Sequence, residues 1–235
     1  MHQFFVTQEL QINSSIDFSK DIAFQIGNVL KLRSGETVWI CDQKKMFEAQ
    51  LNIQGKAVSA TCVREISIEP LKIKVTLIQA LIRREKFELI LQKATELGVD
   101  RIVPLIMERN VVKWENEPEK MLRYRNILKE AAEQCHRLTI PEIVEPIHLK
   151  SIGTYKSELN FVAYEVEDKE HQLKKRLKKC DSVSIIIGPE GGISPREIDL
   201  LNTSGFESVS LGSRIYRAET AAMVAIHTVD CVLDL

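Results

Sequence analysis

The sequence predicts an α/β protein in which a small, mostly β domain precedes a larger domain built on a mostly parallel sheet. The first 66 residues contain closely spaced β-rich segments, and strand-like and helix-like segments alternate from residue 72 onward. A chain of 235 residues can also form two domains. We therefore expect domains at residues 1–70 and 71–235, with the boundary at Pro70, where the pattern changes.

The first domain is expected to be a small β-barrel or sandwich with one short helix. Residues 21–32 (DIAFQIGNVLKL) carry apolar side chains at helical spacing. Three later segments alternate apolar and polar residues, as strands do: GETVWICD (35–42), KMFEAQLNIQ (45–54) and AVSATCVREI (57–66). Their close spacing predicts a meander.

The second domain is expected to form a mostly parallel sheet with helices on both faces. The predicted strands are residues 72–81, 100–107, 160–166, 182–188 and 208–212. The predicted helices are residues 84–99, 118–137, 170–180, 194–206 and 218–235. Gly98 closes the first of these helices as a C-cap. Ser194, Pro195 and Glu197 fit an N-cap, a first helical position and a capping box.

Composition and charge are those of a soluble globular protein. The 44% hydrophobic content and the net charge of -1 argue against a surface coated for nonspecific nucleic-acid binding. No apolar run reaches the ~18 to 20 residues that span a bilayer, and MHQFFVTQEL lacks a signal-peptide layout. We expect a cytoplasmic protein without membrane contact.

Its 5 scattered cysteines form no C-x-x-C pair, which predicts reduced, partly buried thiols and no metal site.

Two predicted helices carry concentrated positive charge. The first charged run comprises Lys174, Lys175, Arg176, Lys178 and Lys179. The second comprises Arg123, Arg125, Lys129 and Arg137. Charge alone favours solvated helix faces for both, and nucleic-acid contact is the alternative.

Two glycine-containing segments, IIIGPEGG (185–192) and VSLGSRIYRAET (209–220), each follow a predicted strand and precede a predicted helix. Parallel strands bring such loops to one edge of the sheet, where glycines let backbone N–H groups approach a polar ligand. Neither segment fits a P-loop or a dinucleotide fingerprint, so we expect neither ATP nor NAD.

The second glycine segment carries candidates for substrate contact. Arg214 and Arg217 suit an anionic substrate, and Glu219 or Thr220 suits hydrogen bonding to it. Alternatively, Glu219 and Thr220 are ordinary residues of the first helical turn, where a carboxylate complements the helix dipole. Position alone leaves both readings open.

The segments IIIGPEGGISPREI and LGSRIYRAETAAMVAI resemble the paired C-terminal motifs of the ribosomal RNA small subunit methyltransferase E family, in the SPOUT superfamily of knotted methyltransferases. Similar matches occur at EAAEQCHRLTIPEI, IMERNVVKW and REKFELILQKATELGVD. HQFFV and IGNVLKLRSGETVWICD resemble the family's small RNA-binding domain. The resemblance covers nearly the whole chain.

The resemblance implies methyl transfer from S-adenosylmethionine to N3 of a uridine in 16S ribosomal RNA or the small ribosomal subunit. It also implies a homodimer, a trefoil-knotted C-terminal domain and a PUA-like N-terminal barrel. The implied cofactor residues are Tyr164, Glu165, Gly188, Pro189, Glu190, Gly191, Gly192, Leu211, Gly212, Ile215, Tyr216 and Arg217. The alternatives are a SPOUT enzyme acting on transfer RNA or a ribose 2′-hydroxyl, and a non-catalytic RNA-binding assembly factor.

N3 methylation requires that the uracil be extruded, lose its imide proton and lie in line with the methyl group. We expect Arg217, or alternatively Arg214, to stabilise negative charge on O2 and O4. Glu190, Glu219 or water is expected to accept the proton. With the family in view, Arg123, Arg125 and Arg137 become the expected RNA phosphate contacts, whereas the 174–179 run stays a solvated face.

Three residues depart from the family pattern. Gln3 stands where an RNA-binding arginine is expected, His136 where a small residue is usual, and Tyr216 where an aliphatic residue is usual. We expect an exposed His136 without a role. Because the glycines are intact, activity is expected to be retained.

Overall fold

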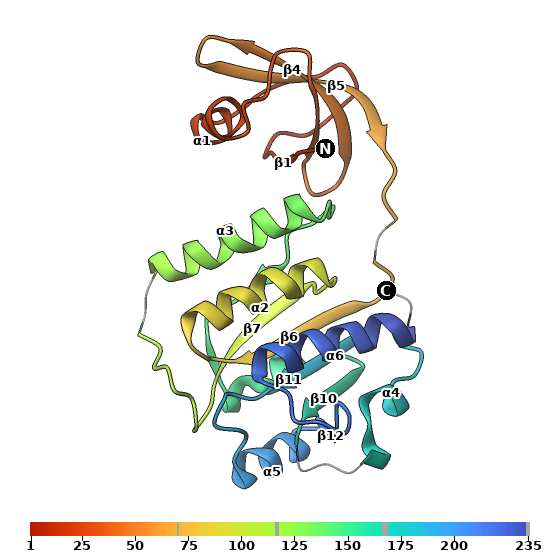
Figure 1. Ribbon diagram of the computed structural model, residues 1–235. Helices are drawn as coiled ribbons and strands as arrows, with labels where there is room; N and C mark the ends of the chain where they lie inside the picture. Colours follow the sequence, from red (N-terminus) through yellow and green to blue (C-terminus); the bar gives the residue numbers. More distant parts are fainter. Residues whose placement is uncertain (70, 116–117, 166–168, 234–235) are drawn as a thin grey trace. The chain divides into compact units, whose positions relative to one another are not determined.

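The protein is described by a computed structural model covering residues 1–69, 71–115, 118–165 and 169–233 (Figure 1). The chain divides into two compact units. The first comprises Met1–Pro70 together with Ala132–Ile140, and the second comprises Leu71–Ala131 together with Pro141–Leu235. Residues 132–140 thus join the N-terminal residues, an arrangement that the sequence did not predict.

A five-stranded sheet forms the first unit, in the order β1-β3-β4-β5-β2. Its strands are β1 (Gln3–Phe5), β2 (Ser15–Asp17), β3 (Thr37–Cys41), β4 (Met46–Gln54) and β5 (Ala57–Ile66). The antiparallel β3-β4-β5 pairing confirms the predicted meander. β1 and β2 lie at opposite edges of the sheet that the described residues form. A closed barrel therefore stays a prediction.

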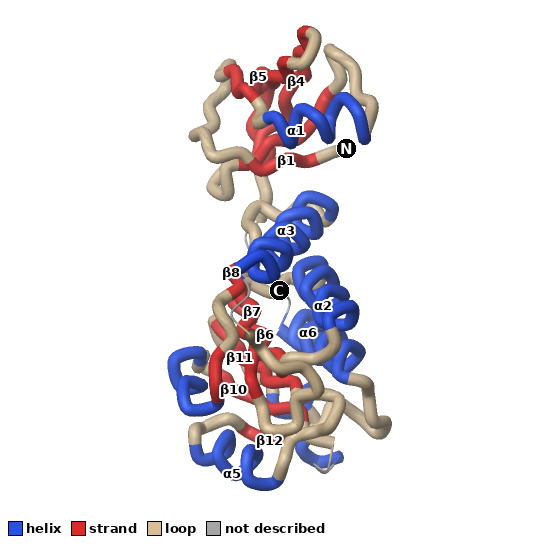
Figure 2. The backbone as a smooth tube through the Cα atoms, turned by 90° about the vertical axis from the view of Figure 1, so that its left-hand side faces the viewer, coloured by secondary structure: helices blue, strands red, loops and turns tan. Residues whose placement is uncertain are grey.

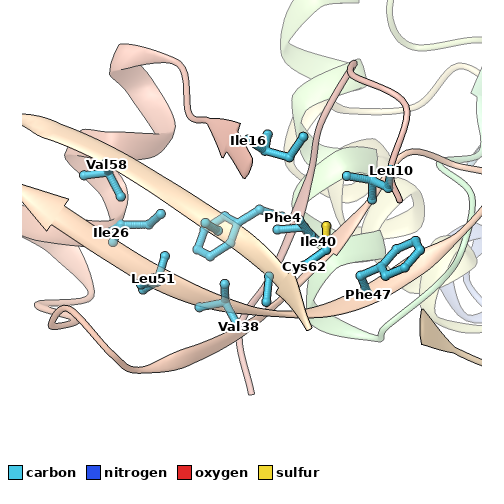
Figure 3. Close-up of a cluster of buried hydrophobic side chains, with 12 residues drawn as sticks. Phe4, Leu10, Ile16, Ile26, Val38, Ile40, Phe47, Leu51, Val58 and Cys62 are labelled. Atoms are coloured by element: carbon cyan, nitrogen blue, oxygen red, sulfur yellow. The ribbon is translucent and has the colours of Figure 1, made fainter. Parts of the chain in front are cut away.

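The predicted helix at 21–32 is confirmed in its first part. Helix α1 (Lys20–Phe24) continues into a π-helical turn, η1 (Gln25–Val29). Ser19 caps α1, because its Oγ accepts the N–H of Ile22 at 3.4 Å. Ile26 of the π-helical turn is fully buried, and Figure 3 shows it among Phe4, Leu51 and other apolar side chains of the sheet.

The segment Ala132–Ile140 is fixed to strands β1 and β3 by polar contacts. The Phe5 N–H donates to the buried Glu133 carboxylate at 3.0 Å, and Gln3 Nε2 donates to the Arg137 carbonyl at 2.8 Å. The Cys41 thiol donates to the carbonyl of Leu138 at 3.1 Å. Gln3 is itself buried, so it holds this segment in place and does not act as a surface contact.

The prediction of an exposed His136 is wrong. Its ring packs edge-to-face against Trp39 with centroids 4.6 Å apart, and its Nδ1 lies 3.4 Å from Gln3 Oε1. Burial lowers the pKa of His136. The residue also has a left-handed backbone with φ of 60°, a conformation that an imidazole tolerates better than a β-branched side chain.

All five cysteines are free, as predicted, and they differ in exposure: Cys41 and Cys62 are buried, whereas Cys231 is exposed. Burial raises the pKa of the Cys41 thiol to about 11, so roughly one thiol in a thousand is ionised at pH 8. We expect iodoacetamide at pH 8 to alkylate Cys231 well before Cys41, as followed by peptide mass spectrometry. Equal rates in the folded protein would contradict the buried position of Cys41.

A seven-stranded sheet forms the second unit, in the order β12-β10-β11-β6-β7-β8, with β9 also paired to β7. The strands are β6 (Lys74–Ala80), β7 (Arg101–Ile106), β8 (Glu142–Ile143), β9 (Ile147–His148), β10 (Leu159–Ala163), β11 (Ser182–Ile187) and β12 (Glu207–Val209). Every strand pairing in the described part of this sheet is parallel, which confirms the predicted α/β class.

Helices cover both faces of this sheet. They are α2 (Arg84–Glu96), α3 (Pro118–Gln134), α4 (Leu173–Arg176), α5 (Pro195–Thr203), α6 (Ala218–Leu233) and the 3-10 turns η2 (Leu149–Tyr155) and η3 (Lys169–His171). Ile78, Val162 and Ile186 pack with α5 and η2 on one face. α6 contacts β6, β11 and α2, and Figures 1 and 2 show α2 and α6 side by side.

The predicted helix at 170–180 is wrong in extent, because helical structure there is limited to η3 and the four residues of α4. The backbone is extended at Gln172 and Leu177. Gln172 forms a β-bridge with Ser210, and the neighbouring Leu173 N–H donates to the Ser210 carbonyl at 2.9 Å. Pairing with a distant segment therefore replaces the local helix. The basic side chains of this run are exposed, as predicted.

Among the described residues, no helix combines the length and apolarity needed to cross a membrane. In the same part of the chain, no group of three or more His, Cys, Asp or Glu side chains is arranged to hold a metal ion.

Candidate functional site

The carboxyl ends of four neighbouring parallel strands define the candidate site. The loop 188–192 follows β11, Tyr164 and Glu165 follow β10, and the loop 210–217 follows β12. Helix α2 begins shortly after β6. Because these strands are parallel and adjacent, their following segments meet at one sheet edge, as predicted.

Two glycines in these loops are required by local geometry. A Cβ at Gly188 would lie 2.7 Å from Cγ1 of Ile193, which is buried. Gly212 has a φ of +145°, a backbone conformation that side chains disfavour. The first loop therefore packs closely against Ile193, and the second needs glycine for its backbone conformation.

Two neighbouring cavities open between the loops. One, of about 220 Å³, is lined by Ala163, Tyr164, Glu165, Ser210, Leu211, Gly212, Ser213, Arg214, Ile215, Tyr216 and Ala221. The other, of about 360 Å³, is lined by Lys86, Glu165, Pro189, Glu190, Gly192, Ile215, Tyr216, Arg217 and Ala218. Glu165, Ile215 and Tyr216 belong to both linings, so the two cavities share a wall. We call them the first and second cavity.

An ion-pair cluster that the sequence did not predict lies at the second cavity. Lys86 Nζ is 3.7 Å from Glu190 Oε1 and 3.5 Å from Glu219 Oε1. The side chains of Lys86, Glu190 and Glu219 are 31%, 22% and 14% exposed. The second carboxylate oxygen of Glu219, Oε2, is buried and has no hydrogen-bond partner among the described residues.

The two candidate arginines of the second loop face different cavities. Arg214 lines the first cavity and Arg217 lines the second, and both side chains are exposed. Between them, Ile215 is 83% exposed. The carbonyl of Arg217 accepts the Ala221 N–H at 2.8 Å, so this arginine sits at the start of α6.

A second residue that the sequence did not single out is Arg109, which follows β7. Its Nη1 donates to the carbonyl of Gly191 at 3.3 Å. A Cβ at Gly191 would approach the Arg109 backbone oxygen to 3.0 Å, so the two segments are in close contact. Arg109 and Lys86 both lie in segments that resemble family motifs. For Arg109, a charged residue shortly after a parallel strand was the available signal.

The start of helix α5 anchors the other end of the first loop. Ser194 Oγ accepts the Glu197 N–H and Glu197 Oε2 accepts the Ser194 N–H at 3.1 Å, which confirms the predicted capping box. Glu197 Oε1 also accepts the Glu108 N–H at 2.7 Å, and Ser194 Oγ donates to Glu108 Oε2 at 2.9 Å. Residues directly after Gly192 are thereby tied to the segment after β7.

The three arginines expected at RNA belong to different units. Arg123 and Arg125 lie on the part of α3 in the second unit, whereas Arg137 belongs to the first unit. Arg123 makes two hydrogen bonds to Glu88, at 2.6 and 2.7 Å, and this contact lowers the pKa of the Glu88 carboxyl. Arg125 is exposed, whereas Arg137 is half-buried.

Comparison with known proteins first defines the class. Residues 69–230 match a family model described as an RNA methyltransferase domain. Ribosomal RNA small subunit methyltransferase E of Bacillus subtilis is 30% identical over 100% of this chain and 98% of its own length. The protein of the same name from Rickettsia conorii is 32% identical, covering 97% and 94%. The chain belongs to the ribosomal RNA small subunit methyltransferase E family.

Solved structures agree with this assignment. Ribosomal RNA small subunit methyltransferase E from Neisseria gonorrhoeae, bound to S-adenosyl methionine, matches with a TM-score of 0.91 and 27% identity over 99% of this chain and 98% of that one. A methyltransferase of Legionella pneumophila in complex with the same cofactor matches with a TM-score of 0.90 and 32% identity, covering 97% and 96%.

Proposed function

We propose that this protein transfers a methyl group from S-adenosylmethionine to N3 of a uridine in 16S ribosomal RNA, as free RNA or within the small subunit. The observation that carries the proposal is the pair of adjoining cavities for cofactor and base, the second of which is lined by both glycine-containing loops. The family supports it, because the Neisseria and Legionella relatives hold S-adenosylmethionine.

The residues present fit this cofactor. Gly188 and Gly212 keep the loop backbone bare where a side chain would clash or be strained, so N–H and C=O groups remain available to an adenine edge. Glu165, shared by both cavities, supplies negative charge for a cationic sulfonium. We assign to the cofactor cradle Tyr164, Glu165, Gly188, Pro189, Glu190, Gly191, Gly192, Leu211, Gly212, Ile215, Tyr216 and Arg217.

The bound cofactor supplies an electrophilic methyl group. The chain's own residues hold the base in line, exclude water and handle the N3 proton. Arg217 lines the second cavity, where its guanidinium can neutralise charge on O2 or O4, and Arg214 is the alternative. Glu190 and Glu219 are the candidate proton acceptors.

At the level of the fold, we propose a trefoil knot in the second unit, a PUA-like barrel in the first, and a cytoplasmic homodimer. Two observations support the knot and the dimer. The loops after β11 and β12 line a common cavity, as a threaded arrangement requires, and the exposed Ile215 at this cavity provides an apolar surface for a second copy.

The proposal is tested by methyl transfer in vitro. Small ribosomal subunits and transfer RNA from a strain that lacks this protein would be incubated separately with the purified chain and S-adenosylmethionine, and each RNA digested for mass spectrometry. We expect one added methyl group, on N3 of a uridine in 16S RNA. A methyl group on transfer RNA or on a ribose oxygen, or no transfer despite cofactor binding, would refute it.

RNA affinity is expected to fall steeply with added salt, because basic side chains displace counterions from phosphates. Arg125→Ala should reduce the slope of log affinity against log salt by about 1. Arg123→Ala should reduce it less, because Glu88 already neutralises that guanidinium. Fluorescence anisotropy at several salt concentrations gives the slopes, with Arg101→Ala as the control. A salt-independent affinity would contradict phosphate contact.

A further inference from the structure

Within the proposed function, we propose that Lys86 and Glu190 together recognise the Watson–Crick edge of the acceptor uracil. Lys86 donates a hydrogen bond to its O4 carbonyl oxygen, and Glu190 accepts the N3 proton. Glu219 is a positioning residue that holds Lys86. This assignment adds a base-recognition residue and separates the roles of two carboxylates that the sequence left open.

The placement of the two carboxylates distinguishes them. Glu190 lines the second cavity together with Lys86, whereas Glu219 is absent from its lining. Glu219 is the more buried of the two, and its Oε2 is shielded from solvent. A base that enters the cavity therefore meets Glu190, not Glu219.

The contact between Lys86 and Glu219 fixes the ammonium. Lys86 lies in the first turn of α2 and Glu219 in the first turn of α6, two helices that pack against each other. Their 3.5 Å ion pair is mostly shielded from water on the Glu219 side, at 14% exposure. A flexible lysine side chain is thereby held at the cavity beside Glu190, 3.7 Å away.

The chemistry of this pair matches uracil. An ammonium only donates hydrogen bonds, and a carboxylate only accepts them. The uracil edge presents a carbonyl acceptor next to the N3–H donor, so both contacts are satisfied. Cytosine presents an amino donor and a bare N3 acceptor at the same places, and both contacts would be repulsive. The cavity of about 360 Å³ is in the size range of small-ligand sites.

The reaction step balances with these groups. The N3–H bond breaks, and its proton passes to the Glu190 carboxylate. The N3 electron pair then forms a bond to the methyl carbon, while the carbon–sulfur bond breaks and its electron pair stays on sulfur. The products are the N3-methylated uridine and S-adenosylhomocysteine, and Glu190 releases the proton to water.

The experiment uses the full chain, S-adenosylmethionine and reconstituted small subunits whose 16S RNA contains uridine or 5-fluorouridine. Fluorine makes the N3 proton more acidic, so it offsets the loss of a base. Glu190→Gln should lower kcat about 10²-fold or more on uridine RNA and recover much of that loss on 5-fluorouridine RNA. Its rate should also rise with pH toward the titration of N3 itself, unlike wild type.

Lys86→Met should lower kcat/KM about 10²-fold and narrow the preference for uridine over cytidine at the target position. Lys93→Met is the matched control, because Lys93 lies on the same helix and pairs with Glu96 at 2.8 Å, away from both cavities. Calorimetry gives the S-adenosylmethionine concentration that saturates each variant, and the rates are compared at that concentration.

Several outcomes would overturn the assignment. One is wild-type kinetics in Glu190→Gln. Another is a loss of kcat in this variant that is equal on uridine and 5-fluorouridine RNA and comes with an unchanged pH profile. Rescue by 5-fluorouridine in Glu219→Gln instead would exchange the roles of the two carboxylates and likewise refute it. If Lys86→Met has the same kcat/KM and the same preference for uridine over cytidine as Lys93→Met, Lys86 does not recognise the base. If wild type transfers no methyl group, the proposed function fails; if wild type does and these variants match it, only this inference fails.

Discussion

Replacing Arg217 with alanine is expected to abolish measurable turnover at saturating cofactor, a loss of about 10³-fold in kcat. The Arg217 side chain lines the second cavity and is exposed there. Among the described residues, no carboxylate forms an ion pair with its guanidinium, so its charge is available to the substrate. In the proposed N3 transfer, negative charge spreads to O2 and O4 as the proton leaves, and the guanidinium stabilises that charge.

The measurement is single-turnover methyl transfer, paired with calorimetry of S-adenosylmethionine binding. Arg217→Lys should retain part of the rate, because lysine keeps the positive charge but lacks the planar guanidinium and its paired N–H donors. Arg214→Ala is the matched comparison, since Arg214 lies on the same loop but lines the first cavity. Full activity in Arg217→Ala would rule out the role, and a larger loss in Arg214→Ala would transfer it to that residue.

The long elements of the fold could be predicted because their side-chain periodicity reflects burial. Strand β5 has the predicted bounds, Ala57–Ile66, and β11 follows from its run of β-branched residues. The strands β8 and β9 have only two residues each, too few to show a period. The helix predicted at 170–180 failed because Gln172 pairs with Ser210, which no local pattern records.

The site residues that the sequence did not predict are those whose role depends on contacts between distant segments of the chain. The glycine loops were predictable, because a strand end followed by glycines and a helix cap is a local signal. Lys86 reads locally as an exposed residue of an amphipathic helix, and only the fold brings Glu190 and Glu219 to it. In the same way, Gln3 resembles a lost RNA contact, whereas the structure shows it holding the Arg137 carbonyl.

Glu197→Ala is expected to lower the free energy of unfolding by about 3 kcal/mol, because it leaves buried donors without an acceptor. The Glu197 side chain is buried and accepts the N–H groups of Glu108 and Ser194. A methyl group replaces neither hydrogen bond. The capping box at the start of α5 is lost at the same time.

A loss of this size corresponds to a fall in Tm of about 6–12 °C for a chain of this length. Thermal unfolding by circular dichroism measures it. Asp199→Ala is the matched control on the same helix, because its side chain is exposed, and it should change stability by less than about 0.5 kcal/mol. Glu197→Gln should be intermediate, since its amide retains one acceptor oxygen.

The effect should extend to the loop 188–192, which we propose to contact the cofactor. Ser194 follows Gly192 by two residues, so a loosened helix start leaves the loop 188–192 less well fixed, and ordering it on binding costs affinity. We expect S-adenosylmethionine to bind Glu197→Ala about tenfold more weakly at a temperature where the protein is folded. An unchanged Tm would show that the two N–H groups find other acceptors. A lowered Tm with unchanged cofactor affinity would show that the loop keeps its shape without the cap.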